Sequence, residues 1–336
     1  MLNRTLDGFA RKPFLLLFLG CVVLVQQAVP QASRIAATPS AWAQVLQEPG
    51  IKYTGPIIDV HLHTDPPRSA IGVPNPVTGA KPAATAAELR DAVIEQCKRY
   101  NIVRAVLNGW PGTLQSWVDK DPTRFIAAPM ILDQDKRPVL DVATLRRDLQ
   151  GGRAGAVGEI LSQYVGLDPN DPELEPYWAL AEELDFPVMI HTGTSFPGTV
   201  YSGYPAFRLR LGNPLLLEDV LAKHPKLRLW IAHGGEPWRE ETFALMAQYP
   251  QVYMDIAIIN WIGGLAGRPG FHAFLKQAID RGLEKRIMFG SDEMAWPDAI
   301  SLAIQGVDSA AFLTPEEKRD IFYNIAATFL RLRDLH

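Results

Sequence analysis

Short apolar runs alternate with longer amphipathic stretches from about residue 51 to the end of the chain. Several of these runs are almost continuously apolar, which is typical of strands that are covered on both faces. The runs lie at residues 56–61, 102–108, 125–131, 154–160, 186–191, 227–233, 252–257 and 286–292. The pattern therefore predicts eight buried strands.

Helical patterns occupy the segments between these runs. Residues 85–101 begin with Thr85, a good N-terminal cap, and Glu88 follows three residues later. Similar patterns cover residues 171–185, 213–225, 271–283 and 313–332. Strands that alternate with helices predict parallel βαβ units, and eight units favour a (β/α)8 TIM barrel of the α/β class. We expect one barrel domain over residues 51–336.

The first 43 residues have a different character. Arg4, Arg11 and Lys12 precede the apolar run 14–25, which is shorter than the roughly 20 residues that span a bilayer. A basic start, a short apolar run and the small residues Ala41 and Ala43 indicate a secretory signal peptide. Residues 1–43 are thus predicted to direct export to the periplasm or the extracellular space. The alternative is an N-terminal membrane anchor through residues 14–25.

Composition narrows the classes of partner. The chain has 336 residues, 47% of them hydrophobic, and a formal net charge of −4. This near-neutral balance gives no reason to expect nucleic acid as a partner, and membrane attachment is expected only through the N-terminal segment. The two cysteines are Cys21 and Cys97, and Cys97 lies in an amphipathic helix pattern as a core thiol. The sequence leaves open whether the chain forms a homo-oligomer.

Titratable residues gather where the predicted strands end. They are His61, His63, Glu159, His191, His233 and Asp292. Four of the chain's seven histidines belong to this set, and the carboxyl ends of barrel strands converge on one mouth. Alternate strand residues face one side, so we also expect Asp59 on the side of His61 and His63, although deeper in the barrel, as a partner of a ligand or a buried structural acid rather than a ligand.

Histidine nitrogen and carboxylate oxygen are ligands that suit a divalent ion, and zinc is the ion that this donor set favours. Such an ion activates water and polarises a carbonyl group. We expect His61, His63, His191 and Asp292 to bind it. Glu159 is a candidate for a ligand, a substrate contact or a partner of a ligand histidine. His233 is a candidate site residue or a brace of the barrel.

The motifs that carry these residues resemble a known family. "DVHLH" (59–63), "FPVMIHTG" (186–193), "WIAHGG" (230–235) and "IMFGSDEMAWP" (287–297) are similar to those of the amidohydrolase superfamily. They most resemble its amidohydrolase-related branch, which includes aminocarboxymuconate-semialdehyde decarboxylase. The resemblance covers about residues 55–333 and implies a (β/α)8 barrel with a metal at its C-terminal mouth.

The resemblance also implies roles for single residues. His61, His63 and His191 correspond to metal ligands, and Asp292 to an aspartate that binds metal and acts as general base. His233 corresponds to a ligand in binuclear members and to a proton donor or carbonyl-polarising group in mononuclear ones. Glu159 stands where binuclear members often carry a carboxylated lysine. Because a glutamate can bridge two metals in some members, one or two ions remain open.

The predicted site and the family resemblance are compatible with three functions. The leading hypothesis is a metal-dependent hydrolase of an amide, lactone or ester bond in a small molecule, with Asp292 moving the proton and His233 stabilising the oxyanion. The alternative is a non-oxidative decarboxylase or hydratase of a small carboxylic acid, although the His-x-His first strand differs from decarboxylases that supply a glutamate there. The third is a metal-binding or ligand-binding barrel without activity.

Substrate contacts are expected from loops beyond the strand ends. Residues 192–213 form a long connection without a helix pattern, and long loops in compact domains are often functional. Arg208 and Arg210 in this loop can pair with a substrate carboxylate or simply face solvent. Trp110 and Trp261, which follow the second and seventh strands, are candidates for the pocket wall or for packing.

Overall fold

The structure is a computed structural model that describes residues 50–65, 72–132, 140–262 and 267–332. The predicted signal peptide or anchor over residues 1–43, with its apolar run 14–25, lies outside these ranges. Within the ranges that are described, no helix is both long enough and apolar enough to cross a membrane.

The described part of the chain contains eight parallel strands, one in each predicted run. They are β1 (Ile57–His63), β2 (Ile102–Gly109), β3 (Phe125–Pro129), β4 (Val157–Ile160), β5 (Val188–Ile190), β6 (Leu229–Ile231), β7 (Val252–Asp255) and β8 (Ile287–Met288). Strands β1 to β3 pair in order, and so do β4 to β8. Gly155 N donates to Ala127 O at 2.9 Å, and Val60 N to Phe289 O at 3.0 Å. These bonds join the two groups into a closed TIM barrel.

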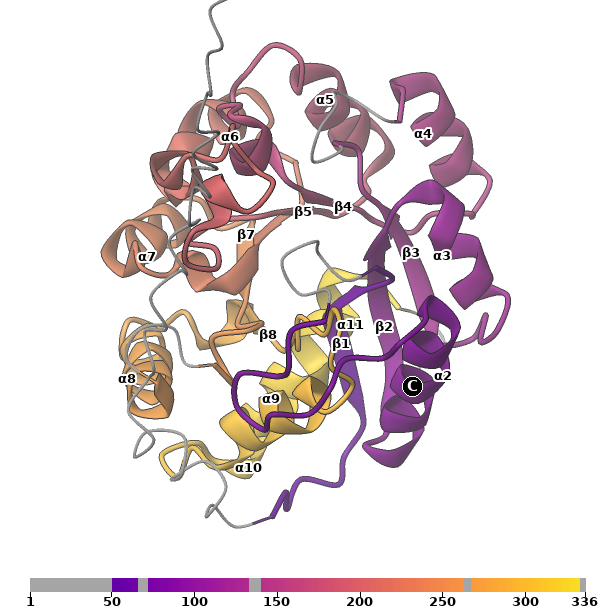
Figure 1. Cartoon of the computed structure of the whole chain (residues 1–336). Helices are drawn as coiled ribbons and strands as arrows, with labels where there is room; N and C mark the ends of the chain where they lie inside the picture. Colours follow the sequence, from indigo (N-terminus) through magenta and orange to yellow (C-terminus); the bar gives the residue numbers. More distant parts are fainter. Residues whose placement is uncertain (1–49, 66–71, 133–139, 263–266, 333–336) are drawn as a thin grey trace, which may run out of the picture. The chain divides into compact units, whose positions relative to one another are not determined.

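Helices follow the strands and surround them (Figure 1). They are α2 (Ala86–Arg99), α3 (Pro111–Val118), α4 (Val142–Gln150), α5 (Glu175–Leu184), α6 (Glu218–Lys223), α7 (Arg239–Gln248), α8 (Gly267–Asp280), α9 (Ala299–Asp308), α10 (Pro315–Arg319) and α11 (Ile325–Phe329). The predicted cap of α2 is confirmed, because the Thr85 side chain accepts a hydrogen bond from Glu88 N. Residues 192–213 form only short 3-10 turns, in keeping with the missing helix pattern.

Two helix predictions needed revision. The pattern over residues 213–225 yields a 3-10 turn, Pro214–Leu217, and only then the short helix α6. The Asn213 side chain accepts a hydrogen bond from Leu215 N and so stabilises the tighter turn at its start. The pattern over residues 313–332 is divided by a π-helical stretch, Asp320–Asn324, between α10 and α11.

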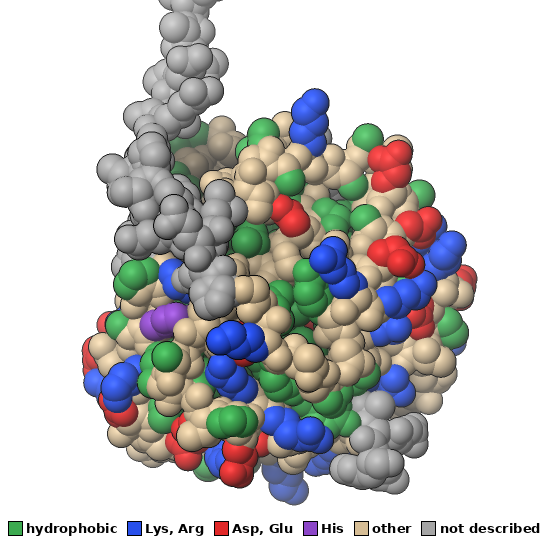
Figure 2. Space-filling view, turned by 90° about the horizontal axis from the view of Figure 1, so that it is seen from below, with side chains coloured by type: hydrophobic (Ala, Val, Ile, Leu, Met, Phe, Trp, Pro, Cys, Tyr) green, Lys and Arg blue, Asp and Glu red, His purple; other side chains and the backbone are tan. Residues whose placement is uncertain are grey.

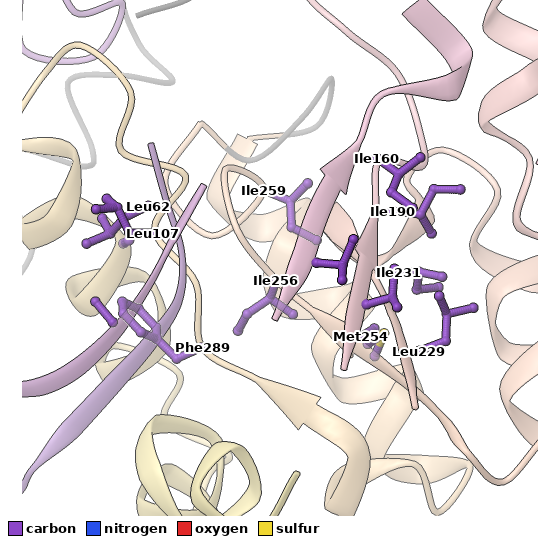
Figure 3. Close-up of a cluster of buried hydrophobic side chains, with 14 of the residues drawn as sticks. Leu62, Leu107, Ile160, Ile190, Leu229, Ile231, Met254, Ile256, Ile259 and Phe289 are labelled. Carbon is purple, nitrogen blue, oxygen red and sulfur yellow. The ribbon is translucent and has the colours of Figure 1, made fainter. Parts of the chain in front are cut away.

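Two apolar layers hold the barrel together. Ile58, Val106, Met189, Trp230 and Met288 belong to the layer inside it. Phe329 of α11 packs edge-on against Trp230, with ring centroids 5.5 Å apart, so α11 covers the N-terminal end of the barrel. The second layer lies between strands and helices and includes the side chains labelled in Figure 3. The C-terminal end is therefore where polar side chains can collect.

Strand β1 departs from simple alternation. Its pairing with β2 shifts register between Asp59 and Leu62, so one extra residue is accommodated there. Ile58 and Val60 belong to the inner layer, whereas Leu62 belongs to the outer one. Asp59 does not join the histidine side chains as alternation predicts. Its carboxylate accepts hydrogen bonds from His61 N and Ser291 N, both at 3.0 Å.

The described surface carries charges of both signs. Figure 2 shows lysine, arginine, aspartate and glutamate side chains interspersed on one face of the molecule. Pairs such as Arg146–Glu183 and Arg281–Glu240 link neighbouring helices. This distribution agrees with the near-neutral composition.

Asp308, the last residue of α9, fastens the start of the barrel domain to its end. Its carboxylate accepts hydrogen bonds from Lys52 N at 2.5 Å and Tyr53 N at 3.2 Å, and Lys318 Nζ lies 3.0 Å away. Burial alone would raise the pKa of Asp308, but these hydrogen bonds lower it below its usual value. The ionised carboxylate thus stabilises the folded state.

We predict that Asp308→Asn lowers the free energy of unfolding at pH 7 by about 1–2 kcal/mol, because charged hydrogen bonds are weakened. Because the pKa of Asp308 is lower in the folded state, its ionised carboxylate stabilises the fold at pH values above its unfolded-state pKa of 3.8. This stabilisation is lost as the pH falls through the folded-state pKa. Urea titrations should therefore show a constant difference from wild type above pH of about 5 and a shrinking one below about 4. Asp280→Asn, which alters an exposed pair with Lys276, serves as the control. A difference that grows in acid would contradict the assignment.

Candidate metal centre

The barrel brings six titratable side chains of distant sequence together at its C-terminal mouth. His61 and His63 come from β1, Glu159 from β4, and His191, His233 and Asp292 from the residues just after β5, β6 and β8. His61 Nε2 lies 3.2 Å from His63 Nε2. Asp292 Oδ1 lies 3.0 Å from His63 Nε2 and 3.4 Å from His61 Nε2. All of these side chains are buried except that of His63, which is 13% exposed.

Glu159 lies between two groups of histidines. Its Oε2 is 3.8 Å from His61 Nε2 and 3.7 Å from His63 Nε2. Its Oε1 is 3.4 Å from His233 Nε2, and no group in the described residues donates a hydrogen bond to this buried oxygen. Possible ligand atoms cluster within 4.8 Å both in the set His61, His63 and Glu159 and in the set Glu159, His191 and His233. One carboxylate is therefore shared by both sets.

Hydrogen bonds at Nδ1 determine which nitrogen of three of the four histidines faces the site. His61 Nδ1 lies 3.0 Å from Asp255 Oδ2, His191 Nδ1 lies 2.8 Å from Gln163 Oε1, and His233 Nδ1 lies 3.3 Å from Ala257 O. Each partner is an oxygen that accepts, so each Nδ1 carries the proton. In the neutral ring, Nε2 then presents a lone pair to the centre, as a metal ligand must.

Asp255, at the end of β7, is a residue that sequence reasoning missed. Its carboxylate is fully buried and also accepts hydrogen bonds from His233 N at 2.9 Å and Ala257 N at 3.0 Å. It therefore holds the His61 ring and the backbone beside His233 at once. The signal was present, because "VYMDIA" places an aspartate at the end of a predicted strand.

Backbone geometry brings the site residues close to one another. His233 and Asp292 have φ values of 62° and 53°, a left-handed conformation that is uncommon for residues other than glycine. Gly290 allows β8 to approach β1, because a Cβ there would lie 2.8 Å from His61 Cβ and 3.0 Å from Ala257 Cβ. Asp292 N donates to His61 O at 2.8 Å and completes this approach.

The charges of the site favour a bound cation. Burial alone would raise the pKa of Glu159, but the nearby His233 and His61 hold it well below its usual range. Burial alone would also raise the pKa of Asp292, but the neighbouring His61 and His63 lower it below its usual value. Burial lowers the pKa of His191 to about 4. At neutral pH the site thus contains ionised carboxylates and at least one neutral imidazole.

The raised pKa values of His61 and His233 have the same cause, which is the negative charge of the neighbouring carboxylates. Burial would lower the pKa of His61, but Asp255 and Asp292 raise it well above its usual value. Burial alone would lower the pKa of His233, but the side chain of Glu159 raises it above its usual value. Protons on these rings balance the carboxylates, and a divalent ion would supply the same balance.

Within the described residues, no hydrogen bond or ion pair joins the side chains of the other predicted site residues to this cluster. Trp261 is 1% exposed, and its indole N–H donates to Ser291 O at 2.8 Å. Trp110 is half-buried at the start of α3. Arg208 and Arg210 are exposed, and the Arg208 guanidinium donates to Pro205 O and Phe207 O of its own loop.

Two further residues beside the site were not found from the sequence. Gln163 and Tyr164 lie in a 3-10 turn, Ser162–Val165, that follows β4. Gln163 orients His191, and the Tyr164 hydroxyl lies 3.4 Å from His191 Nε2. No motif marks a turn of this kind, so only the fold reveals its position.

A model of the amidohydrolase family matches residues 58–332. The chain belongs to this family. It is accordingly an enzyme of the amidohydrolase superfamily, and the predicted resemblance is confirmed. Its buried histidines and carboxylates, with one Glu159 oxygen that accepts no hydrogen bond in the described residues, fit a divalent-metal centre.

Individual relatives of this family member differ in activity. The gamma-resorcylate decarboxylase of Rhodococcus jostii (strain RHA1) is 25% identical over 283 residues, which are 75% of this chain and 81% of that protein. A dihydroxybenzoic acid decarboxylase from Polaromonas sp. JS666, with bound manganese and 2-nitroresorcinol, has a TM-score of 0.59 at 16% identity, covering 83% of this chain and 97% of that one.

A probable 2-pyrone-4,6-dicarboxylic acid hydrolase from Acinetobacter baumannii, with citric acid bound, has a TM-score of 0.57 at 14% identity, covering 82% of this chain and all of that one. At such identities the solved structures support the barrel fold alone. The names of these similar proteins include both a decarboxylase and a probable hydrolase.

We predict that Asp255→Asn weakens metal binding by about 10- to 100-fold, because partners of ligand histidines typically contribute this much. The amide cannot hold the His61 ring as a carboxylate does. Affinity is measured by competition with a chromogenic chelator. Asp308→Asn, far from the mouth, should bind metal as wild type does. Unchanged affinity in Asp255→Asn would contradict the role given to this carboxylate.

Proposed function

We propose that this protein is a metal-dependent hydrolase of an amide, lactone or ester bond in a small molecule, and that its centre holds two divalent ions, with zinc favoured. The observation that carries the proposal is the position of Glu159. Its two oxygens face different groups of histidines, so this one carboxylate would help to hold both ions.

The number of donors supports two ions. A catalytic zinc site commonly uses three protein ligands and leaves one position open. The site offers four histidines and two carboxylates, which is more than one such ion requires. His61, His63 and Asp292 would hold one ion, His191 and His233 the other, and Glu159 would contact both. Bound ions activate water and polarise the carbonyl group of the substrate.

The chain's own residues divide the remaining tasks. The Asp292 carboxylate, which stays ionised at neutral pH, would accept a proton from the attacking water and deliver it to the leaving group. Asp255 holds the His61 ring in place, and Gln163 holds that of His191. The buried position of these groups keeps bulk water from competing with the substrate.

A second candidate is a non-oxidative decarboxylase of a small carboxylic acid. It is favoured by the 25% identity to a gamma-resorcylate decarboxylase across most of both chains. In this reaction a protonated group near the metal would deliver a proton to the carbon that loses CO2. His233, whose pKa is raised, would fill that role. Arg208 and Arg210 could attract the carboxylate only through a movement of their loop, because both are exposed.

We further propose export through residues 1–43, which rests on the sequence pattern alone. Hydrolysis is compatible with export, since its only co-substrate is water.

We predict that purified protein binds about two divalent ions per chain and that Glu159→Gln retains about one, because an amide bridges two ions poorly. Elemental analysis after removal of loosely bound metal measures the ratio. Glu183→Gln, which alters an exposed pair with Arg146, should keep the wild-type ratio. A wild-type protein that saturates with one ion would contradict the two-ion centre.

We predict that the metal-loaded enzyme hydrolyses members of a panel of lactones, aryl esters and N-acyl amides. The Asp292→Asn variant should lose at least about 100-fold in kcat, because general acid–base catalysis contributes about this much. The same samples are incubated with 2,6-dihydroxybenzoate and assayed for CO2. Release of CO2 without hydrolysis of any compound would replace the leading function by the second one.

A further inference from the structure

Hydroxyl groups form a chain from His191 into the loop that follows β5. The Tyr164 hydroxyl lies 3.4 Å from His191 Nε2 and 2.8 Å from Ser195 Oγ. Ser195 Oγ lies 2.8 Å from Thr199 Oγ1, which lies 2.6 Å from Phe196 O. Thr199 is buried, and Ser195 is partly buried.

Proton counting gives the direction of every bond in this chain. A hydroxyl has one proton, and a carbonyl oxygen can only accept. Thr199 must therefore donate to Phe196 O, which leaves Ser195 as the donor to Thr199. The proton of Ser195 is then used, so Tyr164 must donate to Ser195. The Tyr164 proton points away from the metal centre, and its oxygen lone pairs are free to accept.

The histidine beside Tyr164 also lacks a proton on the side that faces it. Gln163 donates through Nε2 to Gly193 O at 3.0 Å, which orients its Oε1 toward His191 Nδ1. His191 must donate from Nδ1, so Nε2 of the neutral ring carries a lone pair. Two acceptors, Tyr164 O and His191 Nε2, thus face each other without a proton between them.

Such an arrangement requires a partner for each acceptor. An ion at the proposed centre would take up the lone pair of His191 Nε2, whereas the oxygen of Tyr164, which donates its proton to Ser195, still has lone pairs that can accept a hydrogen bond. We propose that Tyr164 is a specificity-determining residue whose phenolic oxygen accepts a hydrogen bond from a hydroxyl or N–H group of the substrate. An anionic oxygen at the same place would meet the lone pairs of Tyr164 and be disfavoured.

Aromatic side chains surround the Tyr164 ring and keep it in place. Its ring makes edge contacts with Tyr204 and Phe207, at centroid distances of 5.1 and 5.2 Å, and with His191 at 4.9 Å. A fixed acceptor discriminates better than a mobile one, because it cannot turn to suit a different ligand. The surrounding rings are also compatible with an aromatic substrate.

The inference rests on the proposed function in placing the substrate at this metal centre, and it adds the class of compound. The substrate would carry a hydroxyl or N–H donor near the bond that reacts. Binding, unlike turnover, can be measured whether the reaction is hydrolysis or decarboxylation, so failure of the proposed reaction and failure of this inference are distinguishable.

The test is calorimetric binding of 2-, 3- and 4-hydroxybenzoate and of the three matching fluorobenzoates to the metal-loaded protein. Fluorine is similar in size to a hydroxyl but cannot donate. For at least one ring position we expect the hydroxyl compound to bind about tenfold more tightly to wild type, the effect of one hydrogen bond. In Tyr164→Phe this preference should fall to a ratio of about one, because the acceptor is gone.

Two further variants separate this role from a structural one. Ser195→Ala leaves the Tyr164 ring in place but frees its proton to turn toward the ligand, so the preference for the hydroxyl compound should also fall. Thr194→Val removes a neighbouring hydroxyl outside the chain and should keep the wild-type preference. The inference is overturned if wild type shows no preference or binds none of the compounds. It is also overturned if the preference survives Tyr164→Phe.

Discussion

The hydrogen bond from Asp292 N to His61 O links the closure of the barrel to the assembly of its candidate metal centre. It joins the last strand end to the first, two segments that are far apart in the sequence. Because Gly290 has no side chain, the backbone after β8 can approach His61 closely enough to make this bond. The Asp292 carboxylate then reaches His63, so closure of the fold and formation of the site depend on the same few atoms.

The centre is stabilised by a balance of buried charge. Ionised carboxylates at Asp292 and Glu159 would be costly in the barrel without positive partners. The histidines supply that charge when protonated, and a divalent ion supplies it when bound. Asp255 is central to this balance because it also accepts two backbone hydrogen bonds, which make its own position rigid. The apolar layers below and around the centre exclude water, and the lower dielectric constant strengthens the interactions between these charges.

Much of this arrangement could be predicted from the chain, for a definite reason. A parallel barrel places the carboxyl ends of all its strands at one mouth, so His61, His191 and Asp292 could be assigned to one site from strand order alone. Asp59 could not be placed in this way, because a register shift in β1 cancels the period of two on which alternation depends. Asp255 could have been found by the same rule as His191, whereas Gln163 and Tyr164 could not, since they lie in an irregular turn.

By itself, the sequence determined the eight strands, the parallel barrel and the residue types at its mouth. Apolar periodicity and the residue types at strand ends are local properties, so they can be recognised in the sequence without knowledge of tertiary contacts. Only the tertiary structure decided that Glu159 lies between two histidine groups and that Asp255 orients His61. Only it showed that the proton of Tyr164 points away from the centre. These features depend on distances between different strands and on the direction of single hydrogen bonds, which no local pattern of residues encodes.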